Sequence, residues 1–87
     1  MTHFILSLIL SLGFLSPQQT DLAAEFSRAV ALQQAGSLRE AADQYRAVIK
    51  LKPDYAEAHA NLGVVLSRLG DYAGAVASYE AALRLKP

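Results

Sequence analysis

Few residues in this chain could do chemistry. The sequence contains two histidines, His3 and His59, four tyrosines and no cysteine, so thiol chemistry, disulfides and cysteine-ligated metals are excluded. A metal site needs three or four ligands, and no such set is suggested around either histidine. No glycine-rich phosphate loop, nucleophile elbow or paired-carboxylate motif occurs. We therefore predict no catalytic residue, no metal site and no cofactor, and we expect that the chain is not an enzyme.

The side chains that remain are better explained by packing. Tyr45 and Tyr79 recur within apolar stripes at helical spacing, which favours a place in a core over a role as catalytic phenols. His59 lies among helix-forming residues, and we expect a packed or half-buried imidazole there. The formal net charge is zero, with eight basic and eight acidic residues, which gives no reason to expect a nucleic-acid partner.

The N-terminal segment differs from the rest of the chain. Residues 1–20 contain no Asp, Glu, Lys or Arg, and residues 4–15 form an apolar run. This run is shorter than the roughly 20 residues that a membrane-spanning helix needs, and its length is typical of the apolar region of a signal peptide. We predict an exported, periplasmic or secreted, protein. A leader that stays attached would tether it to a membrane, and a cytoplasmic protein whose apolar tail packs on the domain is the remaining alternative.

The rest of the chain consists of a repeated pattern. The segment "GSLREAADQYRAVIKLKP" (36–53) aligns with "GDYAGAVASYEAALRLKP" (70–87), and both end in Leu-Lys-Pro. Each unit is rich in good helix formers and is interrupted midway by Gly36 or Gly70, where a helix end favours positive φ. The pattern predicts helices over residues 21–35, 38–51, 55–69 and 72–86. We expect capping boxes at Ser37 with Glu40 and at Asp54 with Glu57.

Short loops place consecutive helices in antiparallel contact. The fold class that follows is an all-α solenoid of antiparallel helix pairs behind an apolar N-terminal leader. We divide the chain into the leader (1–20), a first unit (21–55) and a second unit (56–87). Gly63 lies inside a predicted helix, where glycine costs ~1 kcal/mol relative to alanine. Close packing on a neighbouring helix would explain that glycine.

The two units resemble the tetratricopeptide repeat, a helix–turn–helix unit of about 34 residues. The second unit matches the pattern of that family with His59, Leu62, Gly63, Leu66, Ala75, Tyr79, Ala82 and Pro87. The first unit matches less completely, with Glu25, Arg28, Ala29, Leu32, Ala41, Tyr45, Val48 and Pro53. Terminal repeats often differ from the pattern because their outer face meets water.

The resemblance implies a superhelix whose concave face is lined by the first helix of each repeat, and a protein or peptide ligand in that groove. The implied peptide-binding residues are Phe26, Val30, Gln33, Gln34, Ala60, Asn61, Val64, Ser67 and Arg68. Asn61 is the most distinctive of them, since its amide can both donate and accept a hydrogen bond to a peptide backbone. The family's carboxylate clamp is not expected, because Phe26 and Val30 replace the lysine and asparagine that it needs.

Three functions remain open on the sequence. The first is a protein–protein interaction scaffold. The second is the N-terminal repeat region of a longer enzyme, such as a glycosyltransferase or peptidase, and the third is an assembly factor anchored by the leader. About three repeats are usually needed for a stable solenoid, and the last predicted helix carries apolar residues that would normally cover another repeat. We therefore expect a C-terminally truncated piece, or a chain that completes its fold by self-association through that uncapped helix or with the leader.

Overall fold

The computed structural model describes residues 21–87, and the apolar leader lies outside these described residues. The described chain forms four helices, α2 (Leu22–Gln34), α3 (Leu38–Leu51), α4 (Ala56–Arg68) and α5 (Tyr72–Leu85). The ends of each predicted helix agree closely with those of an observed one. No strand occurs between residues 21 and 87. The all-α prediction is confirmed.

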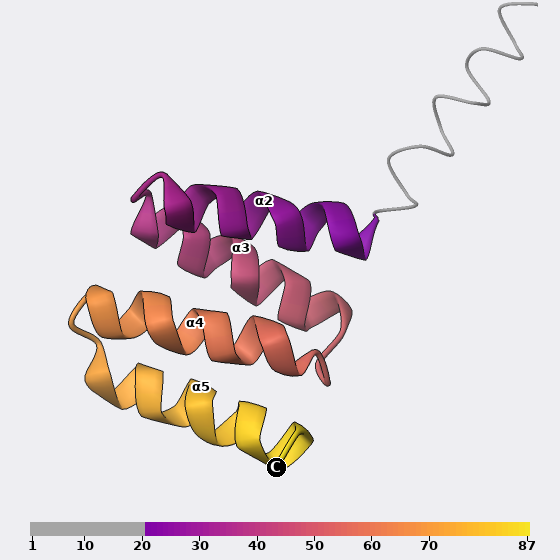
Figure 1. Ribbon diagram of the computed structural model, residues 1–87, viewed down its shortest axis with the longest axis vertical. Coiled ribbons are helices and arrows are strands. Elements are labelled where there is room, and N and C mark those ends of the chain that lie inside the picture. The colour runs from indigo at the N-terminus through magenta and orange to yellow at the C-terminus, as the bar shows by residue number, and fades with distance from the viewer. Residues whose placement is uncertain (1–20) are drawn as a thin grey trace, which may run out of the picture.

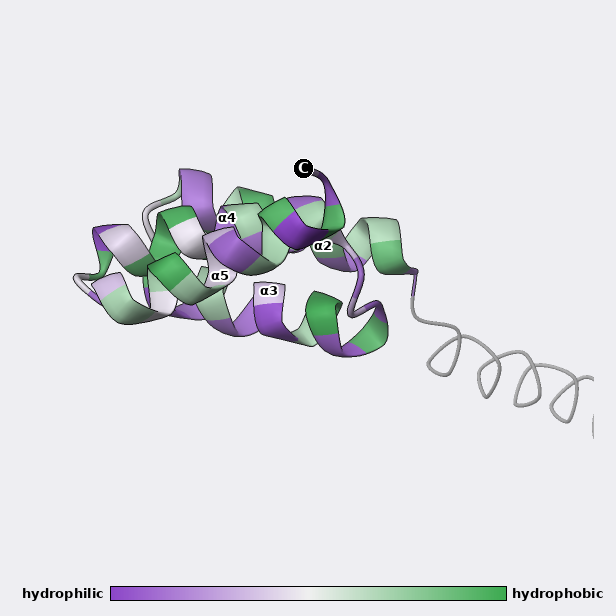
Figure 2. Cartoon of the chain, turned by 90° about the horizontal axis from the view of Figure 1, so that it is seen from below, coloured by the Kyte–Doolittle hydropathy of each residue, from purple (hydrophilic) through white to green (hydrophobic). Residues whose placement is uncertain are grey.

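The helices stack side by side in chain order, α2 on α3, α3 on α4 and α4 on α5 (Figure 1). In the view along the stack, α2 and α4 lie toward one side and α3 and α5 toward the other (Figure 2). The beginning of α2 and the end of α5 lie at the same end of the helices (Figure 1). This arrangement is the solenoid of helix pairs that the repeated sequence pattern predicts.

The two turns within the helix pairs have the same geometry. Gly36 and Gly70 have φ of +82° and +87°, the left-handed region that glycine adopts without steric cost. In the first turn the Ser37 amide donates to the Leu32 carbonyl over 2.9 Å, and in the second the Asp71 amide donates to the Leu66 carbonyl over the same distance. These bonds define a Schellman motif at the end of α2 and of α4.

The helix starts differ from the predicted capping boxes. Ser37 is the N-cap of α3, as predicted, but its side chain makes no capping hydrogen bond. The N-cap of α4 is Tyr55 and not Asp54, so the second predicted box is wrong. The caps that do form are Asp21, which accepts from the Ala23 amide, and Asp71, which accepts from the Gly74 amide over 3.0 Å. Both aspartates stand where the backbone is not yet helical, as an N-cap requires.

The core lies mainly between α3 and α4. Tyr45, Val48 and Val65 are fully buried there. Around them pack buried small and aliphatic residues from all four helices, namely Ala29, Ala41, Ala42, Ala58, Leu62, Leu66 and Ala75. Burial of Tyr45 confirms the prediction that it belongs to the core.

Tyr79 does not belong to the core, which corrects the prediction. Its side chain is 38% exposed, and its ring lies over Gly63 of α4. A Cβ atom added at Gly63 would come within 2.8 Å of the ring, so the predicted close packing at this glycine is confirmed. The residues of α5 that are buried are the small Ala75 and Ser78, whereas its larger apolar side chains are partly or mostly exposed. No helix among the described residues covers them, because α5 is the last of these in the stack.

Candidate functional site

The nine predicted site residues lie on α2 and α4, the first helix of each pair. On α2, Phe26, Val30 and Gln33 are half-buried and Gln34 is exposed. On α4, Ala60, Asn61 and Ser67 are half-buried, whereas Val64 and Arg68 are exposed. The two helices lie on the same side of the stack (Figure 2). The predicted residues therefore share one side of the molecule but differ in how freely a ligand could reach them.

Phe26 joins the two repeats. Its ring stacks on Tyr55, with the ring centroids 4.9 Å apart, and meets the Tyr45 ring edge-on at 5.9 Å. Such aromatic pairs contribute ~0.5–1.5 kcal/mol beyond the area that they bury. Val30 also packs against the core. The sequence could not separate these two residues from ligand-binding ones, because Tyr55 comes from the turn between the repeats and its contact with Phe26 depends on how α4 docks.

A polar row crosses this side of the molecule from α2 to α4. The Tyr45 hydroxyl donates to Oε1 of Gln33 over 2.6 Å, and the Asn61 side chain lies near the same hydroxyl. Burial raises the pKa of Tyr45 above its ordinary value, and the Asn61 side chain lowers it in part. Asn61 therefore lies close to a residue of the core.

The exposed part of the candidate site is on α4. Val64 is 36% exposed, and Arg68 follows one turn later on the same face of the helix. Together with Asn61 they place an amide, an apolar group and a cation along α4. Such a row can contact a peptide through its backbone, an apolar side chain and a carboxylate.

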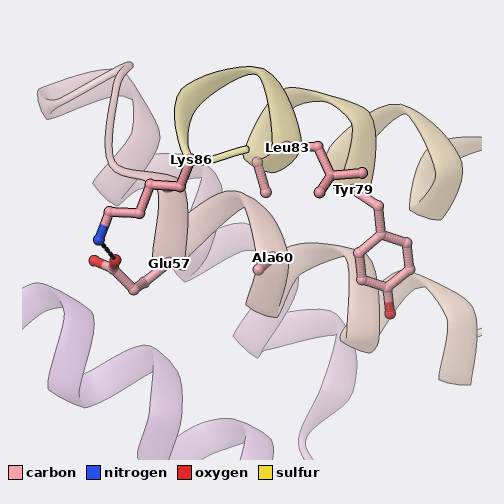
Figure 3. Close-up of a pocket in the computed structure, with 7 residues that line it drawn as sticks. Glu57, Ala60, Tyr79, Leu83 and Lys86 are labelled. Atoms are coloured by element: carbon pink, nitrogen blue, oxygen red, sulfur yellow. Dashed lines mark hydrogen bonds and ion pairs between the residues drawn. The ribbon is translucent and has the colours of Figure 1, made fainter.

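The structure adds a cleft that sequence reasoning missed. It lies between α4 and α5, has a volume of about 450 Å³, and is lined by Ala56, Glu57, Ala60, Tyr79, Ala82, Leu83 and Lys86. We call it the α4–α5 groove. Figure 3 shows Tyr79 and Leu83 on one wall, Ala60 on the other, and an ion pair at one end in which Nζ of Lys86 lies 2.5 Å from Oε1 of Glu57.

A signal for this groove is present in the sequence. Ala60 occupies the position in the second repeat that Phe26 holds in the first. The exchange of a large ring for a methyl group removes the side chain that would otherwise fill the groove. Ala60 is therefore the one predicted site residue that also lines the α4–α5 groove.

His59 is half-buried, as predicted, and its Nε2 lies 2.8 Å from the Pro53 carbonyl oxygen. The imidazole therefore links α4 to the preceding turn. Residues 21–87 contain no group of three or more His, Cys, Asp or Glu side chains that could hold a metal ion. Within the same range no helix is long and apolar enough to cross a membrane.

Four antiparallel helices in two repeated pairs define the class of protein as a helical solenoid. The profile of the tetratricopeptide repeat matches residues 26–87, and the chain belongs to the tetratricopeptide-repeat family. The sequence-based assignment is confirmed. Repeats of this family generally mediate protein–protein interaction.

Two curated relatives are similar to the chain. They are the Protein O-mannosyl-transferase TMTC1 of Homo sapiens and that of Mus musculus, each 35% identical over 75 residues. The match covers 84% of this chain but 8% of either relative. The chain thus spans a small fraction of the length of these proteins.

Proposed function

We propose that the side of the solenoid lined by α2 and α4 binds an extended peptide or a helix of a partner protein. The observation that carries the proposal is the polar row of Gln33, Tyr45 and Asn61. We infer that its place beside the buried Tyr45 orders the Asn61 side chain before a ligand arrives. Ordering before binding lowers the entropic cost of association.

The arrangement supports specific roles on α4. If the Asn61 N–H donates to Tyr45, its carbonyl oxygen is left to accept from a peptide N–H. Val64 contacts an apolar side chain of the ligand, and Arg68 pairs with a carboxylate. Gln34 extends the same surface on α2. The chain itself does no chemistry in this proposal and acts as a scaffold.

A phage-displayed library of random peptides, selected on the full chain, tests the proposal. We expect selected peptides to bind the Asn61→Ala/Arg68→Ala double variant at least about tenfold more weakly, a typical loss for interface residues that contribute ~1.4 kcal/mol or more. The matched control is Arg39→Ala/Arg46→Ala, because both arginines are exposed residues of α3. Equal binding to the two double variants, with unchanged helicity by circular dichroism, would refute the proposed surface.

A second candidate function is favoured by the two relatives. Their name describes a sugar-transferring enzyme, and the part of them that matches is a small fraction of their length. The chain would then be a repeat region of a longer enzyme and would position a substrate or partner for it. Reading the gene beyond the codon for Pro87 decides between the two. Further repeats followed by a stop codon favour the scaffold, and a following catalytic domain favours the enzyme.

The proposal of export rests on the leader and is independent of the solenoid. If the leader is a signal peptide, the mature protein lacks Met1 when the full gene is expressed. N-terminal sequencing of the protein from a periplasmic or secreted fraction tests this. An intact Met1 in the soluble cytoplasmic fraction would overturn the proposal, and an intact Met1 in the membrane fraction would support the tethered alternative.

A further inference from the structure

The hydroxyl of Tyr45 fixes which end of the Gln33 side-chain amide faces the core. The Tyr45 side chain is fully buried, and its hydroxyl donates to Oε1 of Gln33 over 2.6 Å. Burial raises the pKa of Tyr45 above its ordinary value of 10.0, so the hydroxyl stays protonated and remains a donor at neutral pH. The oxygen of the Gln33 amide is therefore occupied by the core.

The nitrogen of the same amide faces solvent. Nε2 of Gln33 donates to no other group among residues 21–87, and no buried side-chain nitrogen or oxygen in that range lacks a hydrogen-bond partner. Because Gln33 is half-buried and its nitrogen has no such partner, Nε2 is open to water. The backbone of this residue is also fixed, since the Gln33 carbonyl accepts from the Gly36 amide over 3.0 Å. Gln33 thus presents two N–H donors from an ordered position.

The surroundings of Gln33 favour a neutral acceptor over an anion. Gln33 lies in the last turn of α2, and that turn contains no basic residue. The carbonyl groups at the end of a helix carry a partial negative charge, which disfavours a carboxylate close to them. A carbonyl oxygen accepts hydrogen bonds without a full charge, so it is the group that best fits these donors.

The need for an unpaired carbonyl separates the two kinds of ligand. In a partner helix, all carbonyls except the last four are already bonded within the helix. An extended segment has no such internal bonds, and each of its residues can offer a carbonyl. The donors of Gln33 therefore suit an extended ligand along its whole length, but a helix only at its C-terminal end.

On the basis of the function proposed above, we propose that Gln33 selects an extended peptide over a partner helix, because its Nε2 donates to a backbone carbonyl of the peptide. Tyr45 is a positioning residue in this scheme. It does not touch the ligand, and it holds the Gln33 amide with the oxygen inward and the nitrogen outward.

The substitution Gln33→Glu tests the direction of the proposed hydrogen bond. Glutamate keeps an oxygen for the Tyr45 hydroxyl and replaces the N–H donors by a second oxygen. We expect the variant chain to bind the tightest peptide of the library selection at least about tenfold more weakly, measured by isothermal titration calorimetry at neutral pH. Ala31→Glu is the matched control, because it adds the same charge at an exposed residue of α2, and it should change the affinity by less than about twofold. Unchanged or tighter binding by Gln33→Glu would overturn the proposal.

The substitution Tyr45→Phe tests the positioning role, because it removes the hydroxyl and keeps the ring. We expect an affinity loss of about threefold and a shift of the nitrogen resonance of the Gln33 side-chain amide in the chain without peptide. A hydroxyl with a merely structural role would change the melting temperature and leave that resonance in place.

The same NMR spectra test the orientation of the amide in the parent chain. We expect the side-chain amide protons of Gln33 to exchange magnetisation with water, since Nε2 is open to solvent. Protection of these protons from water would mean that the nitrogen is turned toward the core, and the proposal would be wrong whether or not a peptide binds.

Failure of this inference can be told apart from failure of the proposed function. If Asn61→Ala/Arg68→Ala weakens peptide binding and Gln33→Glu does not, the peptide binds this side of the solenoid without Gln33, and only the inference is wrong. If the double variant binds as the parent chain does, or if no peptide is selected, the proposed surface is wrong and the inference fails with it. Helical circular dichroism induced in the bound peptide would also contradict an extended ligand.

Discussion

Tyr45 and Tyr79 occupy the same position in the two repeats and lie in different surroundings. Tyr45 is fully buried and hydrogen-bonded to Gln33, whereas 38% of Tyr79 is exposed. The difference comes from the next helix, because α4 covers the first repeat and no described helix covers the second. In a solenoid, burial therefore depends on the neighbouring repeat as much as on the repeat's own pattern.

The largest expected effect contrasts the two tyrosines. Tyr45→Ala should lower the free energy of unfolding by ~3–5 kcal/mol, because it leaves a cavity in a closed core. Tyr79→Ala should cost ~1–2 kcal/mol, because less of the ring is removed from water. Urea unfolding followed by circular dichroism measures both. Equal losses would mean that the second repeat is covered in solution, which would contradict the open groove.

The next largest effect is expected at Gly63, where the result of a substitution to alanine depends on whether the Tyr79 ring is present. Gly63→Ala gains ~1 kcal/mol of helix propensity but crowds the Tyr79 ring, since the new Cβ would lie 2.8 Å from Cε1 of the ring. Overpacking typically costs ~1–3 kcal/mol, so we expect a net loss of about 1 kcal/mol in urea unfolding. The same substitution in a Tyr79→Ala background should stabilise the protein by ~0.5–1 kcal/mol, because only the propensity difference remains.

The first repeat shows that this position of the fold can hold an alanine. Ala29, the counterpart of Gly63, already carries a Cβ and is fully buried, so the fold accepts an alanine at this position when the surrounding side chains are arranged accordingly. A Gly63→Ala variant about 1 kcal/mol more stable than the parent protein would show that the partly exposed Tyr79 ring moves aside without cost.

Much of the fold could be predicted because it rests on local signals. Gly36 and Gly70 end helices by a backbone conformation that their neighbours rarely adopt, and the run of helix formers between them sets the helix lengths. The cap at Asp54 was mispredicted because α4 begins one residue later, after Tyr55, whose side chain makes no capping hydrogen bond. The exposure of Tyr79 could not follow from the pattern of α5 alone, since it depends on what packs next to that helix.

The candidate site was less predictable than the fold. Phe26 and Gln33 were expected to contact a ligand. In the structure Phe26 stacks on Tyr55, and Gln33 accepts a hydrogen bond from Tyr45. Both contacts link residues of different elements, which no periodicity within one helix can show. The α4–α5 groove could have been inferred from the change of Phe26 to Ala60 between repeats, because that change removes a ring from an otherwise equivalent place.

A smaller effect on stability is expected from the N-caps of α3 and α5, the second helices of the two repeats. Asp71 accepts a hydrogen bond from the Gly74 amide at the start of α5, and Ser37 makes no such bond at the start of α3. Asp71→Ala should therefore cost ~1 kcal/mol, and Ser37→Ala should change stability by less than about 0.5 kcal/mol. Thermal unfolding of the two variants measures the difference. A larger loss for Ser37→Ala would show that its hydroxyl caps α3 in solution.

The smallest effect concerns the ion pair at the end of the groove. The hydrogen bond from Lys86 lowers the pKa of Glu57 below its ordinary value of 4.5, and the same bond raises the pKa of Lys86 above 10.5. The contribution of Glu57 to stability is therefore present above pH 4.5 and is lost as the pH falls through its lower folded pKa. That of Lys86 is present below pH 10.5 and is lost as the pH rises through its higher folded pKa.

Carbon-detected NMR titration of the Glu57 carboxyl measures this shift directly. We expect a pKa below 4.5 in the parent chain and a return toward the ordinary value in Lys86→Met. The first repeat cannot form the equivalent pair, because Ala23 takes the place of Glu57 there, and the Lys52 ammonium instead lies 5.5 Å from the centre of the Tyr55 ring. Lys52→Met is therefore the matched control and should leave most of the Glu57 shift in place. An unshifted Glu57 in the parent chain would mean that the ion pair with Lys86 does not form in solution.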